Sequence, residues 1–176
     1  MVLKKNKKRT LNANSKKKTA RNRDFKSKDV KIRGYYSIIL FLMLIFVDRL
    51  TKIWAMNAKN GVDYGVVAIT YTINTGAGFS TFQNMNTILL WLSIIILGLM
   101  IFFNDRLPKF SLVMISAGIV GNLIDRIFYG SVIDFINFKF WPIFNVADSL
   151  ICIGVAWWII IILKYENNTK KNQSKN

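Results

Sequence analysis

The stretch from Thr87 to Phe103 reads TILLWLSIIILGLMIFF and contains no charged residue. A helix that crosses the hydrocarbon core of a bilayer needs roughly 20 mostly apolar residues, so this stretch predicts a transmembrane helix. Three further apolar stretches flank it, and they cover residues 35–56, 111–128 and 145–165. We therefore expect an all-α membrane protein with four transmembrane helices.

The charge of the chain is concentrated before the first of these stretches. The chain carries a net charge of +16, although 52% of its 176 residues are hydrophobic, and fourteen Lys or Arg residues lie within residues 1–33. Residues 1–33 hold too few apolar side chains to form a core, so we expect a disordered tail. Residues 34–165 are then the membrane domain, and residues 166–176 are a second polar tail. The long basic segment also argues against a cleaved signal peptide, so the first apolar stretch is predicted to remain as a span.

Three functions are open to residues 1–33. The segment could fix the orientation of the chain, bind anionic lipid headgroups at about 1 kcal/mol per basic residue, or bind nucleic acid. Only Phe25 places an aromatic ring among the basic residues, and no nucleic-acid-binding module follows. We therefore favour orientation and membrane lipids, and expect no nucleic-acid partner.

The connections between the apolar stretches predict the orientation in the membrane. Both ends of the chain and the turn at 104–110 hold twenty of the 25 Lys and Arg residues, whereas the connections 57–86 and 129–144 hold only Lys59 and Lys139. Basic residues stay on the cytoplasmic side of a membrane. Both termini are therefore expected in the cytoplasm, and the two long connections outside it.

The residues that are missing exclude several kinds of chemistry. The chain has no histidine, and its single cysteine, Cys152, cannot form a disulfide within the chain or a C-x-x-C metal site. Ser-His-Asp catalysis, Cys-His catalysis and histidine zinc sites are excluded. Acid–base chemistry must then use carboxylates, Lys, Tyr or water, and we predict no metal and no cofactor.

Polar residues gather at the outer ends of the apolar stretches. A carboxylate at the middle of a bilayer costs about 2.5–3.5 kcal/mol on insertion scales, so ionisable residues within apolar spans are candidates for function. Several of them stand three or four residues apart, which places them on one helix face. In chain order they are Asp48 and Lys52, then Asn122, Asp125 and Arg126, and then Asn145 and Asp148.

A structural role is the simplest interpretation of several of these residues. Asp48 and Lys52 fit an interfacial ion pair, and the adjacent Asp125–Arg126 fits a pair that locks helices. Helix locking does not account for two further acids, Asp134 in the outer connection and the Asp of the fourth stretch. This surplus of carboxylates indicates a functional site rather than helix packing alone.

Two neighbouring carboxylates can hydrolyse a peptide bond without histidine or metal. Repulsion between like charges raises the pKa of one acid, which stays protonated while the other is ionised. The ionised acid takes a proton from water, and the protonated acid donates to the scissile carbonyl. Such a pair titrates as a unit, and the sequence leaves open which acid holds the proton.

The outer connection before Thr87 carries a strand pattern. Residues 69–74 alternate apolar and polar side chains, and Gly76 and Gly78 follow. A period of two predicts a strand. A small extracytoplasmic sheet and a simple hairpin with a flexible turn are both compatible with this pattern.

Five stretches of the chain resemble the motifs of bacterial lipoprotein signal peptidase (signal peptidase II). They occur in the family's order and with its approximate spacing, over about residues 35–165. They are DRLTK at 48–52, NTGAGFS at 74–80, GNLIDR at 121–126, GSVIDF at 130–135 and FNVAD at 144–148.

The resemblance implies an aspartic endopeptidase of the bacterial cytoplasmic membrane, with several spans and an active site at the extracytoplasmic face. It implies that Asp134 and Asp148 are the catalytic pair. The implied substrate is a prolipoprotein with diacylglycerol on its lipobox cysteine, cleaved just before that cysteine. One chain holds both acids, so a monomer is expected to be active. Residues implied to position the substrate or support the site are Asp48, Lys52, Asn74, Gly76, Asn122, Asp125, Arg126 and Asn145.

The chain departs from the family pattern at two positions. Arg49 stands where the family usually has Gln, and Gly78 stands where it usually has Ala. Neither position belongs to the acid pair, so we expect these departures to affect only substrate preference.

Three other functions remain open. A Ser–Lys peptidase would use Ser80 as nucleophile and Lys52 as base, but would leave Asp134 and Asp148 without a role. A transporter would place its carboxylates near the bilayer midplane and often show internal repeats. An assembly subunit would use the polar residues only to join helices.

Overall fold

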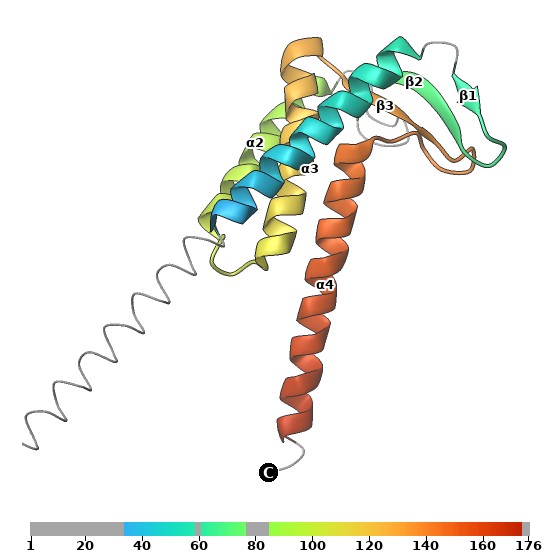
Figure 1. Ribbon diagram of the computed structural model, residues 1–176. Helices are drawn as coiled ribbons and strands as arrows, with labels where there is room; N and C mark the ends of the chain where they lie inside the picture. Colours follow the sequence, from blue (N-terminus) through green and yellow to red (C-terminus); the bar gives the residue numbers. More distant parts are fainter. Residues whose placement is uncertain (1–33, 59–60, 77–84, 174–176) are drawn as a thin grey trace, which may run out of the picture. The chain divides into compact units, whose positions relative to one another are not determined.

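A computed structural model describes residues 34–58, 61–76 and 85–173 of the chain (Figure 1). The chain forms two compact units, Met1–Ile38 and Ile39–Asn176. The described part of the first unit, residues 34–38, is helical. The basic segment 1–33 lies outside the described residues.

The described residues form helices and a small sheet, mostly at the predicted positions. Three of the four helices begin and end within two residues of the predicted spans, whereas the last one begins at Val146 and continues to Gln173. The elements are a helix over residues 34–57, β1 (Val62–Asp63), β2 (Ala68–Asn74), α2 (Asn86–Phe102), α3 (Lys109–Tyr129), β3 (Val132–Asn137) and α4 (Val146–Gln173).

The outer faces of the helices are apolar and exposed, as a lipid environment requires. Most large side chains of α2 are exposed, Phe102 at 79%, and Met100 is its only buried residue among those described. By length and composition, two of the described helices can cross a membrane: α3, and α4 as far as Asn168. The apolar helix α2 is shorter.

Small residues bring α3 and α4 close together. A Cβ atom added at Gly118 of α3 would lie 2.3 Å from the carbonyl oxygen of Ala147, and one added at Gly154 would lie 2.6 Å from Cγ1 of Ile115. Helices in lipid associate through such close backbone contacts, since there is no hydrophobic drive between them. Helix α3 packs against both α2 and α4.

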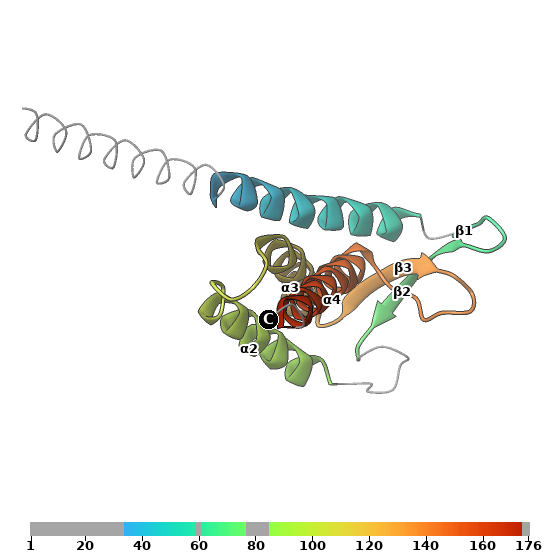
Figure 2. The same ribbon diagram turned by 90° about the horizontal axis from the view of Figure 1, so that it is seen from below.

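The strand pattern forms part of a three-stranded antiparallel sheet in the order β1-β2-β3. Strand β2 pairs with β1 through Ile69 and with β3 through Thr72, which faces Asp134, and the register shifts between Ile69 and Thr72. The structure therefore has the sheet and not the simple hairpin. The sheet lies at the end of the helices where α3 ends and α4 begins (Figures 1 and 2).

Candidate active site

Asp134 and Asp148 come from different elements and meet at one cavity. Asp134 lies in the middle of β3, and Asp148 lies in the first turn of α4. Gly130, with φ of 67°, ends α3 in a left-handed conformation, and β3 starts two residues later. Both acids line a cavity of about 300 Å³, here called the inner cavity.

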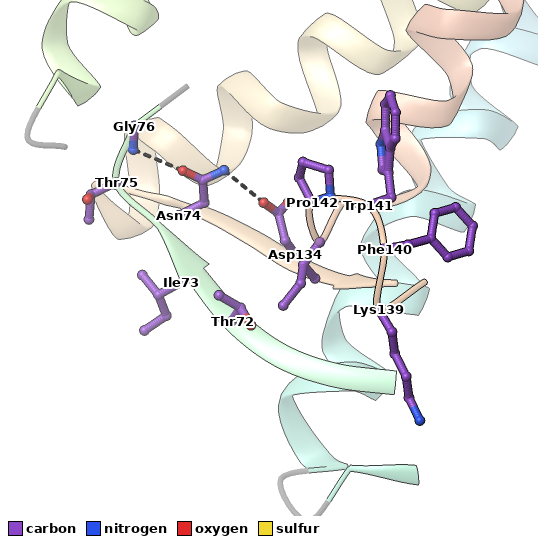
Figure 3. Close-up of a pocket in the computed structure, with 11 residues that line it drawn as sticks. Thr72, Ile73, Asn74, Thr75, Gly76, Asp134, Lys139, Phe140, Trp141 and Pro142 are labelled. Carbon is purple, nitrogen blue, oxygen red and sulfur yellow. Dashed lines mark hydrogen bonds between the residues drawn. The ribbon is translucent and has the colours of Figure 1, made fainter. Parts of the chain in front are cut away.

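Two amide side chains hold the buried Asp134. Asn74 Nδ2 donates to Asp134 Oδ2 at 2.8 Å, and Asn145 Nδ2 donates to Asp134 Oδ1 at 2.6 Å. The backbone N–H of Gly76 donates to Asn74 Oδ1 at 3.0 Å, which fixes the orientation of that amide (Figure 3). Asp134 is only 2% exposed. The pKa of Asp134 is raised to about 6, chiefly by burial and also by the neighbouring Asp148, although the hydrogen bonds from Asn74 and Asn145 oppose the rise.

Asp148 is held by the start of its own helix. The backbone N–H of Asp148 donates to Asn145 Oδ1 at 2.9 Å, and the backbone N–H of Asn145 donates to Asp148 Oδ2 at 3.2 Å. This reciprocal pair is a capping box, which explains the three-residue spacing in the sequence. Asn122 Nδ2 of α3 donates to Asp148 Oδ1 at 2.7 Å. The carboxylate is therefore fixed by both helices.

Beneath the acids lies a group of four charged residues, here called the buried ion cluster: Asp48, Arg49, Lys52 and Asp125. Lys52 Nζ lies 2.7 Å from Asp125 Oδ2 and 3.1 Å from Asp48 Oδ2. Arg49 also pairs with both carboxylates. Asp48 Oδ1 accepts from the backbone N–H of Ala147 at 2.9 Å, so the cluster also supports the start of α4.

The structure corrects two expectations about these ion pairs. The ion pair between Asp48 and Lys52 is confirmed at 3.1 Å, but it is not interfacial, since the two residues are 0% and 1% exposed. Asp125 was expected to pair with Arg126, but its ion pairs among the described residues are with Arg49 and Lys52. Arg49, which was expected to affect only substrate preference, is a member of this cluster. Its position as a third charge beside Asp48 and Lys52, within an apolar stretch, was the signal that could have found it.

Two asparagines connect the buried ion cluster to the acids. Lys52 Nζ donates to Asn122 Oδ1 at 3.0 Å, and Asn145 Nδ2 donates to the same oxygen at 3.1 Å. Because Asn122 Oδ1 faces these donors, its Nδ2 faces Asp148. The chain of contacts therefore runs from Lys52 through Asn122 to Asp148, and through Asn145 to Asp134.

The inner cavity lies between two larger spaces. On the sheet side it shares Asn74, Gly76 and Asp134 with a cavity of about 460 Å³, here called the outer pocket, which residues 72–76 and 139–143 also line. On the helix side it shares Asn122, Arg126 and Asp148 with a groove of about 620 Å³. This apolar groove is also lined by Ile96, Met100, Ile119, Ile151, Val155 and Trp158.

All ten residues singled out as site residues are therefore gathered around one cavity or directly beneath it. Gly78 and Ser80 lie outside the described residues. Lys52 donates to three acceptors and has no lone pair to offer as a base. The arrangement can hold two carboxylates, one of them protonated, around a water molecule.

Comparison with known proteins identifies the family. The profile of the peptidase family A8, described as signal peptidase (SPase) II, matches residues 40–164. The chain is 37% identical to the lipoprotein signal peptidase of Clostridium tetani, over 72% of this chain and 92% of that protein. It is 42% identical to the lipoprotein signal peptidase of Synechocystis sp., over 64% of this chain and 78% of that protein. A solved structure described as a bacterial membrane enzyme superposes with a TM-score of 0.70 at 30% identity, and covers 75% of this chain and 90% of that one. The chain therefore belongs to the signal peptidase II family.

Proposed function

We propose that this enzyme removes signal peptides from diacylglyceryl-modified prolipoproteins by means of the acids Asp134 and Asp148. The family establishes an aspartic endopeptidase that processes prolipoproteins in a bacterial membrane. The location of both acids between the outer pocket, whose lining is partly polar, and an apolar groove carries the proposal.

The proposed topology has four spans over about residues 35–56, 87–103, 111–128 and 145–165, with both termini in the cytoplasm. The distribution of Lys and Arg supports this orientation. Residues 34–165 are then the membrane domain, flanked by the tails 1–33 and 166–176. The sheet and the acids lie at the extracytoplasmic face, and a monomer suffices.

Asp134 is the acid that carries the shared proton in the proposed resting state. It is almost fully buried, and its raised pKa favours the neutral form. Asp148, which accepts hydrogen bonds from the start of α4 and from Asn122, is the ionised partner. In this assignment the more deeply buried acid, Asp134, is the general acid and Asp148 is the general base.

The reaction then follows from these two protonation states. Asp148 takes a proton from water as the water oxygen attacks the scissile carbonyl carbon, and Asp134 donates its proton to the carbonyl oxygen. The tetrahedral intermediate collapses when Asp148 returns its proton to the leaving nitrogen and a hydroxyl proton of the intermediate returns to Asp134. The products are a carboxyl end on the signal peptide and a free amino group on the lipidated cysteine.

The two spaces beside the inner cavity accept the two halves of such a substrate. A signal peptide is apolar, and the apolar groove extends from Asp148 along α3 and α4. The chain that follows the cysteine is polar and leaves toward the outer pocket, where Asn74 and Lys139 line the wall. The scissile bond then lies between the two acids.

The remaining candidates account for less of the structure. A Ser–Lys peptidase requires Lys52 as a base, yet Lys52 is buried with two carboxylates and an amide oxygen as acceptors. A transporter or an assembly subunit has no need of a hydrolytic acid pair, and the family consists of peptidases.

Cleavage of a diacylglyceryl-modified prolipoprotein by the purified enzyme in detergent, with a chelator present, tests the proposal. Wild type should cleave just before the lipidated cysteine. Asp134→Asn and Asp148→Asn should remain folded and lose at least about a thousandfold in rate, because neither acid can be replaced in proton transfer. Asp105→Asn is the matched control, since Asp105 is exposed in the turn between α2 and α3, and it should cleave like wild type.

Each contrary outcome has a distinct meaning. Activity in both acid variants would exclude the pair and direct attention to Ser80 and Lys52. Loss of activity on chelation would contradict a metal-independent mechanism. Failure of well-folded wild type to cleave would contradict the proposed substrate.

A further inference from the structure

Arg49 occupies a position in the buried ion cluster to which no function has been assigned. Its two terminal nitrogens make three contacts: with Asp125 Oδ1, with Asp48 Oδ2 at 2.7 Å and with the carbonyl oxygen of Gly121 at 2.9 Å. Its side chain is 21% exposed, whereas both carboxylates are fully buried. Arg49 therefore joins the first helix to α3 from the rim of the cluster.

The charges of the cluster balance only when Arg49 is included. Two buried carboxylates face one buried ammonium, that of Lys52, and Arg49 supplies the second cation. An uncompensated buried charge is costly in a low-dielectric interior. Without Arg49, Lys52 would be the one cation paired with both carboxylates among the described residues.

Lys52 also donates a hydrogen bond to Asn122, and this contact competes with its pairing to the two carboxylates. An ammonium group has three protons, and those of Lys52 point to Asp48, Asp125 and Asn122 Oδ1, the last at 3.0 Å. Together with the contact from Asn145 Nδ2 at 3.1 Å, this contact fixes which end of the Asn122 amide faces Asp148. A Lys52 drawn fully toward the carboxylates would leave Asn122 Oδ1 with Asn145 as its remaining donor, and the amide would be held less firmly.

We propose that Arg49 is a positioning residue for peptide cleavage: by sharing the two buried carboxylates with Lys52, it leaves one Lys52 proton to orient Asn122 toward Asp148. The inference rests on the proposed function of Asp134 and Asp148. Arg49 itself touches neither acid among the contacts described, and it acts through Lys52 and Asn122.

The test compares Arg49→Gln and Arg49→Lys in the same prolipoprotein assay, in which wild-type activity first establishes the reaction itself. Arg49→Gln replaces the cation with the neutral residue that the family usually has here, and in place of an effect on substrate preference alone we expect it to lower kcat of this chain by about ten- to a hundredfold with little change in KM, because misplacement of about 1 Å has effects of this size. The added net negative charge should also move the alkaline limb of the pH–rate profile to higher pH, since it favours protonated acids. Arg49→Lys should recover part of both effects.

Two controls separate positioning from folding and from total charge. Rates are expressed per folded molecule, from size-exclusion and thermal unfolding in detergent. Lys109→Gln removes one positive charge at the opposite end of α3, where Lys109 is exposed, and should leave both kcat and the pH profile unchanged. In an Asn122→Ala background, Arg49→Gln should have little further effect, because residues acting through one another are not additive.

Three outcomes would overturn the proposal. Arg49→Gln could lower the unfolding midpoint and leave the kcat and pH profile of folded enzyme intact, which would make Arg49 purely structural. Equal losses in Arg49→Lys and Arg49→Gln would exclude charge sharing. If Arg49→Gln lowered kcat by the same factor in the Asn122→Ala background as in wild type, Arg49 would not act through Asn122.

Discussion

Asn74 donates a hydrogen bond to Asp134 that favours the ionised carboxylate, so substitution of Asn74 should shift the pKa of Asp134 in one direction. Without this donor the charged form is less stable, and the pKa of Asp134 rises above about 6. In the proposed mechanism Asp134 must be protonated, so kcat/KM falls as the pH rises through that pKa. We expect Asn74→Ala to move this alkaline limb of kcat/KM to higher pH, even where the maximal rate is lower.

The matched control for this prediction is Asn137→Ala. Asn137 lies on β3 and donates to Thr70 Oγ1 at 3.4 Å, so it holds the same two strands without touching Asp134. Its alkaline limb should stay near that of wild type. A limb that moves to lower pH in Asn74→Ala, or one that moves equally in both variants, would contradict the assignment.

At the scale of single residues, sequence and structure agree on which side chains gather but not on how they pair. Helical spacing was sufficient for Asn145 and Asp148, because a capping box is a local structure. The interpretation of Asp125 and Arg126 as a pair that locks helices was wrong, since adjacent residues on a helix point in different directions. The partner Arg49 lies 76 positions away, and only the packing of two helices brings it close.

At the scale of the elements, the contact between α3 and α4 determines the distance from Asn122 to Asp148. Gly118 has no room for a side chain, since a Cβ there would lie 2.3 Å from the carbonyl oxygen of Ala147, one residue before Asp148. We expect Gly118→Ala to separate the helices, lower the thermal unfolding midpoint in detergent and reduce cleavage. A backbone atom cannot yield as a flexible side chain can, so the loss should be large.

Gly98 of α2 provides the comparison for that variant. A Cβ at Gly98 meets no atom within 4 Å, and alanine favours a helix over glycine by about 1 kcal/mol. Gly98→Ala should therefore keep full activity and an unfolding midpoint at or above that of wild type. Similar destabilisation by both substitutions would mean that close packing at Gly118 is not the cause.

The elements themselves were predictable where the signal is local. Apolar length located the helices, but it indicates where a span ends and not where a helix ends, so the continuation of α4 to Gln173 was missed. The sheet could not be distinguished from a hairpin because β2 pairs with β3, about sixty residues later. The short β1 and the register shift near Ile69 likewise have no local signal.

At the scale of the whole molecule, the proposed chemistry depends on where the acids lie across the membrane. The outer pocket, the inner cavity and the apolar groove follow one another through the enzyme. Cleavage outside the cytoplasm requires the outer pocket to lie on the extracytoplasmic side. The positive-inside pattern predicts this direction from the sequence alone. The predicted orientation depends on α2 crossing the membrane, although α2 is the shortest of the apolar helices.

Labelling of single cysteines tests that crossing directly. In a Cys152→Ala background, which removes the exposed native thiol, a cysteine replaces either Tyr64 in the turn between β1 and β2 or Asp105 in the turn after α2. One membrane crossing, that of α2, separates the two positions in the proposed topology. A membrane-impermeant maleimide should label Tyr64→Cys in intact spheroplasts and label Asp105→Cys only after permeabilisation, with both variants still active. Labelling of both from outside would mean that α2 does not span the bilayer, and labelling of Asp105→Cys alone would invert the enzyme and place the acid pair on the cytoplasmic side.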